Sequence, residues 1–390
     1  MKSIIRRAAY EAPTEEVEIP KKVAPEDTGL KEFVERVKAK IVIMGLGGAG
    51  SNTITRLNAL GIKDAITVAA NTDGQHLLES VADRKVLLGR ELCGGSGAGG
   101  DPRIGEEAAK ESIPELRDVL DGTDILFLMV GLGGGTGTGG APVVAELAKE
   151  LGAVVVSIVT LPFSAEGRKK KELALSGLQN LAKSSDTIVV INNDRILEIA
   201  RDLPLHQAFL VSDEIMARSV KGIVELVTRP GLINVDLADL RTVLEGGGPA
   251  LLAFGESDGE NRAIEAIDDA LSNPLLEADI SGGRAGIVNI TCGADFSLQE
   301  MEQIVETVVG ALEPDANVIW GARIEDSLRG AVQVLLVVTG VRNPYLEGIF
   351  PMPARREARE VRRVERVPAI PARRGGKQED VLADLGIEEV

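Results

Sequence analysis

Ten consecutive residues, Gly131 to Gly140 (GLGGGTGTGG), contain seven glycines and two threonines. Each glycine in an ordered chain costs about 0.5–1 kcal/mol relative to alanine, so such a run persists where the backbone itself must touch something. Glycine lets backbone amides approach a phosphate closely, and Thr136 and Thr138 add hydroxyl donors. The run follows an apolar stretch, Ile125–Val130, and precedes a helical one. We therefore expect its amides at a helix N-terminus, where anions bind.

Two further segments have a similar glycine content. Gly45–Asn52 (GLGGAGSN) lies between a strand-like and a helix-like stretch. It matches the dinucleotide fingerprint G-x-G-x-x-G, although a tight turn without a ligand would explain it too. Gly94–Gly100 (GGSGAGG) precedes Asp101 and Pro102, which suit a helix cap and a first helical residue; alone it could be a flexible surface loop. The three segments hold 16 of the 44 glycines. We expect all three at the carboxyl edge of one sheet, where open α/β sheets bind ligands, and three such loops suit a polyphosphate.

Two other nucleotide-binding classes fit these loops less well. The sequence has no GxxxxGK[ST] motif, so it is not a Walker-type P-loop protein. A nicotinamide or flavin enzyme would need one glycine loop and an acid after the second strand. Asp73 could serve as that acid, but the run from Gly131 to Gly140 would then have no role. An oxidoreductase stays open as an alternative at this point.

Composition excludes several further classes. The net charge of −17 argues against a nucleic-acid-binding surface. Two cysteines, Cys93 and Cys292, are too few for a disulfide framework or a four-cysteine zinc site. Two histidines, His76 and His206, leave little room for a histidine metal site or a Ser-His-Asp triad, and we assign no metal-binding side chain. Apolar runs are shorter than the ~18 residues of a membrane span, and the first residues lack the apolar core of a signal peptide. We expect a cytoplasmic protein.

Apolar and amphipathic stretches alternate between residues 40 and 191. Continuous apolar strands separated by helices predict a parallel sheet covered on both faces. The stretch His206–Thr228 predicts a helix roughly 35 Å long. Beyond it the alternation is irregular, which indicates a smaller α+β domain. The expected strands of the first part are 40–45, 65–70, 84–88, 125–130, 153–160 and 187–191, and its expected helices are 51–60, 102–120, 142–151 and 167–184.

Five motifs in a fixed order resemble the tubulin/FtsZ superfamily of assembling GTPases. They are GGAGSN (47–52), NTD (71–73), GGGTGTGG (133–140), TLPFSAEG (160–167) and NVDLADLR (234–241). The FtsZ branch fits better than tubulin itself, and the N-terminal extension resembles that of archaeal members. The resemblance implies an α/β fold in which a Rossmann-like parallel-sheet GTPase domain is joined by a long central helix to a smaller α+β domain. It also implies GTP or GDP, with Mg²⁺, as cofactors.

The resemblance assigns roles to the matching residues. Glu166 would bind the ribose hydroxyls, and Lys170 stands where the family often has arginine. Asn193 and Asp213 would read the guanine. A carboxylate at position 213 can accept hydrogen bonds from both the ring N–H and the amino group of guanine, a donor pair that adenine lacks on that edge. Asn192 stands where many relatives have proline. The residues expected around the phosphates are Gly47, Gly48, Ala49, Gly50, Ser51, Asn52, Asn71, Asp73, Gly133, Gly134, Gly135, Thr136, Gly137, Thr138 and Gly139.

The phosphate loops contain neither a general base nor a lysine, so hydrolysis needs groups from elsewhere. Asp236 and Asp239 are spaced to share one face at a helix start, and by resemblance they act with Asn234 on the attacking water. The long helix should hold them far from the nucleotide of their own chain. The resemblance implies that head-to-tail stacking brings them onto the GTP of the next subunit, which makes a filament with shared active sites. Acids here would also suit a helix N-terminus without any catalytic role.

The expected organisation has six parts, and charge divides unevenly among them. Residues 40–350 carry a net charge of −18, whereas residues 351–377 carry +6 and can form a disordered linker or touch anionic lipid. By resemblance, the partners are further copies of the chain and a membrane adaptor that binds the tail segment LADLGI (382–387). The acidic charge and the short apolar runs predict no nucleic-acid partner and no transmembrane segment. The resemblance places the protein at the mid-cell division ring beneath the membrane. A filament scaffold that controls cell shape instead of division is the other open alternative. The expected parts are an extension (1–39), a GTP-binding domain (40–205), a central helix (206–229), a C-terminal α+β domain (230–343), a flexible basic linker (344–378) and an acidic tail peptide (379–390).

Overall fold

A computed structural model represents the 390-residue chain. It describes residues 39–199, 204–229, 231–272 and 280–350. Nearly all of the expected N-terminal extension, most of the expected linker and the whole tail peptide lie outside the described residues. Within the described residues, no helix is long and apolar enough to cross a membrane.

Six parallel strands form the first part of the sheet, in the order β3-β2-β1-β4-β5-β6. The central strands are buried along their length, which is typical of a sheet covered on both faces. Every strand expected in this part is present, with each end within one residue of the predicted position. The strands are β1 (Ile41–Leu46), β2 (Ile66–Asn71), β3 (Arg84–Leu87), β4 (Ile125–Gly131), β5 (Val154–Leu161) and β6 (Thr187–Asn192).

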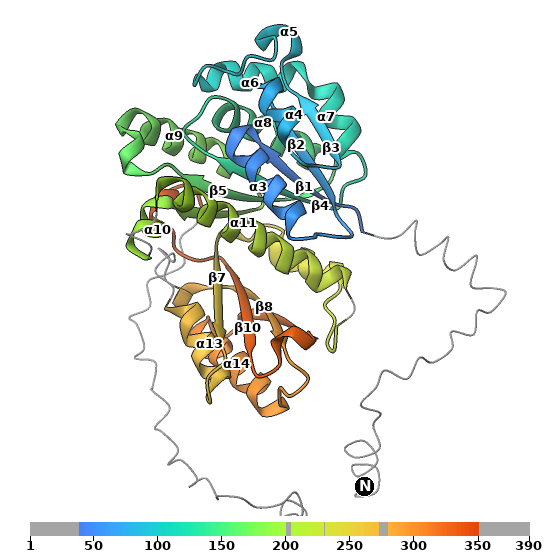
Figure 1. The fold of residues 1–390 in the computed structure, drawn as a ribbon, viewed down its shortest axis with the longest axis vertical. Coiled ribbons are helices and arrows are strands. Elements are labelled where there is room, and N and C mark those ends of the chain that lie inside the picture. Colours follow the sequence, from blue (N-terminus) through green and yellow to red (C-terminus); the bar gives the residue numbers. More distant parts are fainter. Residues whose placement is uncertain (1–38, 200–203, 230, 273–279, 351–390) are drawn as a thin grey trace, which may run out of the picture. The chain divides into compact units, whose positions relative to one another are not determined.

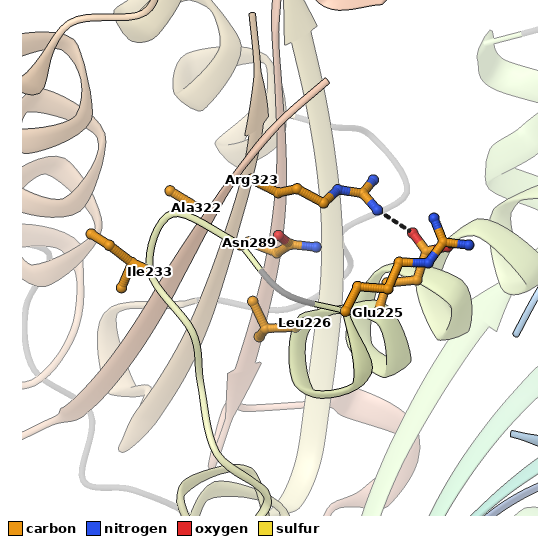
Figure 2. A pocket seen from close by; sticks show the side chains of 8 residues that line it. Glu225, Leu226, Ile233, Asn289, Ala322 and Arg323 are labelled. Atoms are coloured by element: carbon orange, nitrogen blue, oxygen red, sulfur yellow. Dashed lines mark hydrogen bonds and ion pairs between the residues drawn. The ribbon is translucent and has the colours of Figure 1, made fainter. Parts of the chain in front are cut away.

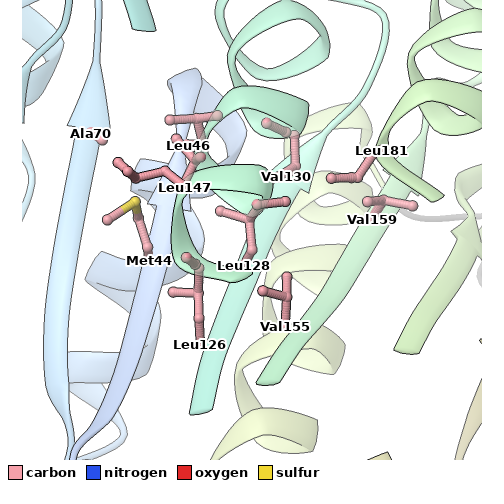
Figure 3. Close-up of a cluster of buried hydrophobic side chains, with 14 of the residues drawn as sticks. Met44, Leu46, Ala70, Leu126, Leu128, Val130, Leu147, Val155, Val159 and Leu181 are labelled. Carbon is pink, nitrogen blue, oxygen red and sulfur yellow. The ribbon is translucent and has the colours of Figure 1, made fainter. Parts of the chain in front are cut away.

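Helices cover this sheet, and the contact between strands and helices is apolar (Figure 1). Alternate side chains of β1 and β4 face one layer of helices, because successive residues of a strand point to opposite faces. Figure 3 shows part of that cluster, which includes Met44, Leu46, Leu126, Leu128, Val130, Leu147, Val155, Val159 and Leu181. The helices are α3 (Gly47–Ala59), α4 (Gly74–Glu79), α5 (Arg90–Cys93), α6 (Pro102–Glu111), α7 (Ile113–Leu120), α8 (Thr136–Glu150), α9 (Arg168–Ser184) and α10 (Asn193–Ile199).

Three helices differ from the prediction. Helices α3 and α8 begin at Gly47 and Thr136, several residues before the predicted starts, so the glycine segments form their first turns. The predicted helix 102–120 is two helices that meet at Ser112. The interruption has a local cause: Pro114 has no N–H to continue the ladder and is tolerated only in the first turn of a new helix.

The 24-residue helix α11 (Leu205–Thr228) leads from this sheet to the C-terminal part, as predicted. The sheet also continues there directly, which was not predicted: β6 pairs in parallel with β7 over three residues, and the order then runs β7-β10-β8-β9. A second apolar cluster joins these strands to α13 and α14. The elements are α12 (Leu237–Leu244), β7 (Gly248–Ser257), α13 (Arg262–Leu271), β8 (Ala285–Cys292), α14 (Leu298–Ala311), β9 (Asn317–Ile324) and β10 (Val332–Thr339).

Candidate nucleotide-binding site

An open cavity of about 280 Å³ lies at the carboxyl ends of β1, β4 and β5. Twelve of the predicted cofactor-binding residues line it, which brings together segments from five parts of the sequence. They are Gly47, Gly48, Ala49, Asn52, Gly134, Gly135, Thr136, Gly137, Glu166, Lys170, Asn193 and Asp213. The cavity is also lined by Gly131, Leu132, Thr160 and Pro162, which lie in the predicted motifs without an assigned role, and by Phe209, Ser212 and Met216, which the sequence did not single out.

Seven predicted residues do not line this cavity. Ser51 is buried and its hydroxyl is closed off from solvent. Gly50 and Gly139 are also buried, and they let backbone segments pack closely. A Cβ at Gly139 would overlap the carbonyl oxygen of Pro102, so glycine is needed here for α8 to touch α6. The seven residues are Gly50, Ser51, Asn71, Asp73, Gly133, Thr138 and Gly139.

The first and third glycine segments lie side by side and form the predicted phosphate cradle. They follow β1 and β4, which are neighbours in the sheet, and each continues as the first turn of a helix. Gly47 adopts a φ of +73°, and a Cβ there would lie 3.1 Å from the amide nitrogen of Gly137. At Gly134 a Cβ would meet nothing within 4 Å. Two helix N-termini with open, amide-rich backbone therefore converge on one cavity, an arrangement that binds anions.

The second glycine segment has a different role from the one expected. It follows the short helix α5 rather than a strand, and it does not line the cavity. Its backbone supports the residues after β2: Gly74 N donates to Gly95 O at 2.9 Å, and Gly97 N donates to Thr72 O at 3.1 Å. As predicted, Asp101 caps α6, and its side chain accepts from Arg103 N. The segment thus holds the β2 loop in place.

The residues after β2 connect to the cradle through two side chains that sequence reasoning missed. Thr72 Oγ1 shares a hydrogen bond of 2.6 Å with Thr136 Oγ1 at the start of α8. The His76 ring lies between two asparagines: Nδ1 is 3.1 Å from Asn71 Nδ2, and Nε2 is 3.0 Å from Asn52 Oδ1. A neutral ring with its proton on Nε2 satisfies both contacts. His76 lies outside the five motifs. The only available signal was its position three residues after Asp73, the last residue of the motif NTD.

The predicted ribose segment forms a tight turn at the rim of the cavity. Glu166 Oε1 accepts from the backbone N–H of Phe163 at 2.9 Å, which fixes the carboxylate. Lys170 Nζ donates to Glu166 Oε2 at 2.8 Å. Lysine in the position where the family often has arginine therefore still pairs with the acid, but as a single donor rather than a planar fork.

The predicted guanine readers lie together in the lining of the cavity. Ser212 Oγ donates to Asn193 Oδ1 at 3.0 Å. Thr53, on α3, donates from Oγ1 to Asp213 Oδ1 at 2.8 Å. Burial raises the pKa of the Asp213 carboxyl to about 6, against the opposing effects of the Thr53 hydrogen bond and the charge of Arg56. The departure at Asn192 is accommodated, because its amide donates to Tyr345 OH at 3.0 Å.

The predicted catalytic residues Asn234, Asp236 and Asp239 are exposed and do not line this cavity. They follow α11, and the 16 residues from Asp213 to Thr228 span about 22 Å of helix. Asp236 is the N-cap of α12, since its Oδ1 accepts from Asp239 N at 2.7 Å. Asp236 therefore caps the helix, as the sequence analysis allowed. This hydrogen bond uses one of the four carboxylate oxygens of Asp236 and Asp239.

Backbone pairing and an ion cluster hold the segment that carries these residues. Ile233 pairs with Ala322 of β9 through N–H to O bonds of 3.1 and 3.2 Å. Beside this pair, Arg323 binds the buried carboxylate of Glu225 across a small cavity (Figure 2). The loop that begins at Gly231 is therefore anchored to both α11 and β9.

The site's side chains offer little to a metal ion on their own. In the part of the chain that the structure describes, no group of three or more His, Cys, Asp or Glu residues could hold one. Mg²⁺ prefers several oxygen ligands and commonly takes them from substrate phosphates and water. The donor set fits a Mg²⁺ ion that arrives with a nucleoside triphosphate.

Comparison with known proteins gives a consistent match. Residues 40–201 match the model of the tubulin/FtsZ family GTPase domain, and residues 248–342 match that of the FtsZ family C-terminal domain. The chain is 51% identical over 322 residues to the cell division protein FtsZ of Methanothermobacter thermautotrophicus, covering 83% of this chain and 84% of the relative. It is 50% identical to the cell division protein FtsZ 1 of Pyrococcus abyssi, covering 87% and 91%.

Solved structures agree with these sequence matches. An FtsZ dimer from M. jannaschii superimposes with a TM-score of 0.77 at 50% identity, covering 82% of this chain and 93% of that one. A GTPγS-bound protofilament of CetZ2 from Haloferax volcanii gives a TM-score of 0.65 at 25% identity, covering 78% and 94%.

Proposed function

The chain belongs to the tubulin/FtsZ family of GTPases, and we propose that it binds and hydrolyses GTP, assembles head-to-tail into filaments and scaffolds cell division. The observation that carries this proposal is the composition of one cavity. Two helix N-termini rich in backbone amides line it, together with Asp213 and Asn193. A phosphate cradle and a purine-reading carboxylate in one cavity suit a guanine nucleotide.

The proposed roles follow from this arrangement. Backbone amides of the cavity-lining residues Gly47–Ala49 and Gly134–Gly137 bind the phosphates, with Thr136 adding a hydroxyl. Glu166, already oriented by Phe163 N, accepts from the ribose hydroxyls. Asp213 accepts from the N1–H and the amino group of guanine. Mg²⁺, when bound with the triphosphate, neutralises charge that develops during transfer.

Hydrolysis needs a group that the cavity does not supply. The only carboxylates among its described lining residues are Glu166 and Asp213, which we assign to the ribose and the base. Asp236 and Asp239 are exposed at the other end of α11. A second copy, stacked head-to-tail, would present this end to the cavity and so complete the site. Asp239 is the better candidate to polarise the attacking water, since Asp236 caps α12 and Asp239 makes no side-chain hydrogen bond within the described residues.

Division is favoured over control of cell shape because the chain shares about half of its residues with proteins named for cell division. We also propose that the acidic tail binds a membrane adaptor and that the filament works at the division ring beneath the membrane. Fluorescent tagging of the chain with and without residues 379–390 tests that part, because loss of the tail should release the ring from the membrane.

The test of the proposed activity is nucleotide content and turnover of the purified full chain. We expect bound guanine nucleotide, and a GTPase rate per molecule that rises steeply with protein concentration as sedimentable polymer appears. Retained NAD or FAD without guanine nucleotide, or a rate per molecule that is the same at every concentration, would contradict the proposal.

A further inference from the structure

One hydroxyl contacts both a predicted guanine reader and a residue of the predicted phosphate cradle. Thr53 is fully buried on α3, and its Oγ1 is 2.8 Å from Asp213 Oδ1 and 3.1 Å from the carbonyl oxygen of Ala49. A threonine hydroxyl has a single proton, so it can donate to only one of these acceptors at a time. Ala49 belongs to the phosphate cradle, and Asp213 lies 160 residues away in sequence.

The other charges around Asp213 do not replace this contact. Arg56, on α3, acts on the Asp213 carboxylate only through its charge, because its guanidinium binds Glu214. On α11 itself, Glu214 also binds Arg218. Elsewhere around the cavity, Glu166 and Lys170 are paired with each other. The Thr53 hydroxyl is therefore the direct hydrogen-bond donor that the structure gives to this half-buried acid.

We propose that Thr53 is a positioning residue for guanine recognition: its hydroxyl holds one oxygen of the Asp213 carboxylate, so that the charged group faces the N1–H and amino donors of the base. This inference rests on the proposed role of Asp213 in reading guanine. A hydrogen bond to the ionised form of an acid favours that form, whereas burial disfavours it. Thr53 thus offsets part of the cost of keeping a desolvated carboxylate charged.

The same hydroxyl couples Asp213 to the phosphate cradle. While Asp213 is ionised, Thr53 donates to it. When Asp213 takes up a proton, its own O–H becomes a donor, and Thr53 turns to the Ala49 carbonyl, a common partner for a threonine four residues later in a helix. Guanine binding is therefore linked to the hydrogen bonding of the phosphate cradle through one proton.

The test compares nucleotide affinity across pH for the full chain and three variants. Thr53→Val keeps the shape and removes the donor, Thr53→Ser restores the donor, and Thr55→Val is the matched control. Thr55 lies on the same helix and bonds a carbonyl four residues back, but it does not contact Asp213. Dissociation constants for GTP and for ITP, which lacks the 2-amino group, are measured between pH 5 and pH 8.5.

GTP affinity should fall at low pH as Asp213 takes up a proton. We expect Thr53→Val to raise the midpoint of this fall by about one pH unit, because the ionised acid loses a stabilising hydrogen bond. At pH 6.5 this corresponds to affinity about threefold weaker, and the preference for GTP over ITP drops about threefold as well. Thr53→Ser should restore both, and Thr55→Val should change neither. Should Thr53→Val fail to fold, Thr53→Ala gives the same readout.

Two outcomes separate this inference from the proposed function. An unchanged pH midpoint and unchanged GTP/ITP preference in Thr53→Val, with Asp213→Asn strongly impaired, would overturn the role of Thr53 alone. Unchanged GTP affinity in Asp213→Asn would overturn the assignment of Asp213 itself.

Discussion

Arg323 of β9 donates a hydrogen bond of 3.0 Å from Nη1 to Oε2 of Glu225, near the end of α11 (Figure 2). Glu225 is only 5% exposed, and Arg229 and Lys221 lie 2.9 and 3.4 Å from its other oxygen. Arg323 directly follows Ala322, which pairs with Ile233 one residue before Asn234. The ion pair therefore connects α11 to the loop that carries the proposed catalytic residues.

Arg323→Ala should lower the GTPase rate of assembled protein several-fold while leaving GTP affinity unchanged. The substitution loosens the anchor of the catalytic loop but touches nothing in the nucleotide cavity. It should also lower the free energy of unfolding by about 1–3 kcal/mol, since a buried carboxylate loses one of its partners and keeps two. Steady-state hydrolysis, equilibrium binding and urea denaturation measure the three quantities.

The matched control is Arg329→Ala, an exposed arginine that follows the same strand. It should leave all three quantities close to those of the parent chain. If Arg323→Ala weakens GTP binding as much as hydrolysis, the cluster supports the fold in general and does not position this loop in particular.

Asp213→Asn should change the preferred purine. A carboxylate presents two acceptors, which match the N1–H and amino group of guanine. An amide presents one acceptor and one donor, which match the N1–H and C2 carbonyl of xanthine. We expect GTP affinity to fall at least about 30-fold, as for loss of a charged hydrogen bond, with xanthosine triphosphate binding more tightly than GTP. Competition binding measures this, and equal loss of both nucleotides would argue against a base-reading role.

The stability of the nucleotide-free protein should carry a pH signature from Asp213. Its pKa is about 6 in the folded chain and near 3.8 when unfolded, so the folded state holds the extra proton between these values. The stability that this group contributes is present below about pH 3.8 and is lost as pH rises through about 6.

Asp213→Asn should therefore be more stable than the parent at pH 7.5 by about 1–3 kcal/mol, and the difference should shrink towards pH 4.5. Urea denaturation at both pH values measures it, with Asp268→Asn, an exposed acid, as control. A difference that is equal at both pH values would contradict the buried-acid description.

His76→Ala should weaken nucleotide binding although the residue does not line the cavity. The ring links Asn52 of the phosphate cradle to Asn71, the last residue of β2, and its loss frees both amides. Loss of a hydrogen bond of about 1 kcal/mol corresponds to roughly fivefold weaker binding of GTP and GDP. His76→Gln, which keeps one donor and one acceptor, should recover part of the affinity. Parental affinity in the alanine variant would show that the bridge is not needed.

The sequence predicted strands and motif order well because those features are local. Continuous apolar stretches placed the strands of the first part of the sheet to within a residue, and the glycine segments marked the edge where the cavity lies. Helix starts were less predictable. Glycine has a poor helix propensity, so the pattern placed the starts of α3 and α8 after the glycines. In the structure, contacts between the two segments and with α6 fix those glycines in helical turns.

Contacts between distant residues could not be read from the pattern. Thr53 and Asp213 lie 160 residues apart, and nothing in the threonine's local context distinguishes it from Thr55. The joining of β6 to β7 depends on only three residue pairs. The second glycine segment looked like the other two, and its different role follows from α5, a helix of four residues that the pattern did not reveal.

The shared active site is tested most directly by mixing two inactive variants. Asp239→Ala keeps its nucleotide cavity but lacks the proposed acid, whereas Asp213→Asn keeps the acid but binds GTP poorly. Each alone should hydrolyse GTP slowly. In an equal mixture, a junction between the two contains an intact cavity from one subunit and an intact Asp239 from the other. The account predicts a GTPase rate several-fold above the mean of the separate variants; a rate equal to that mean would contradict it.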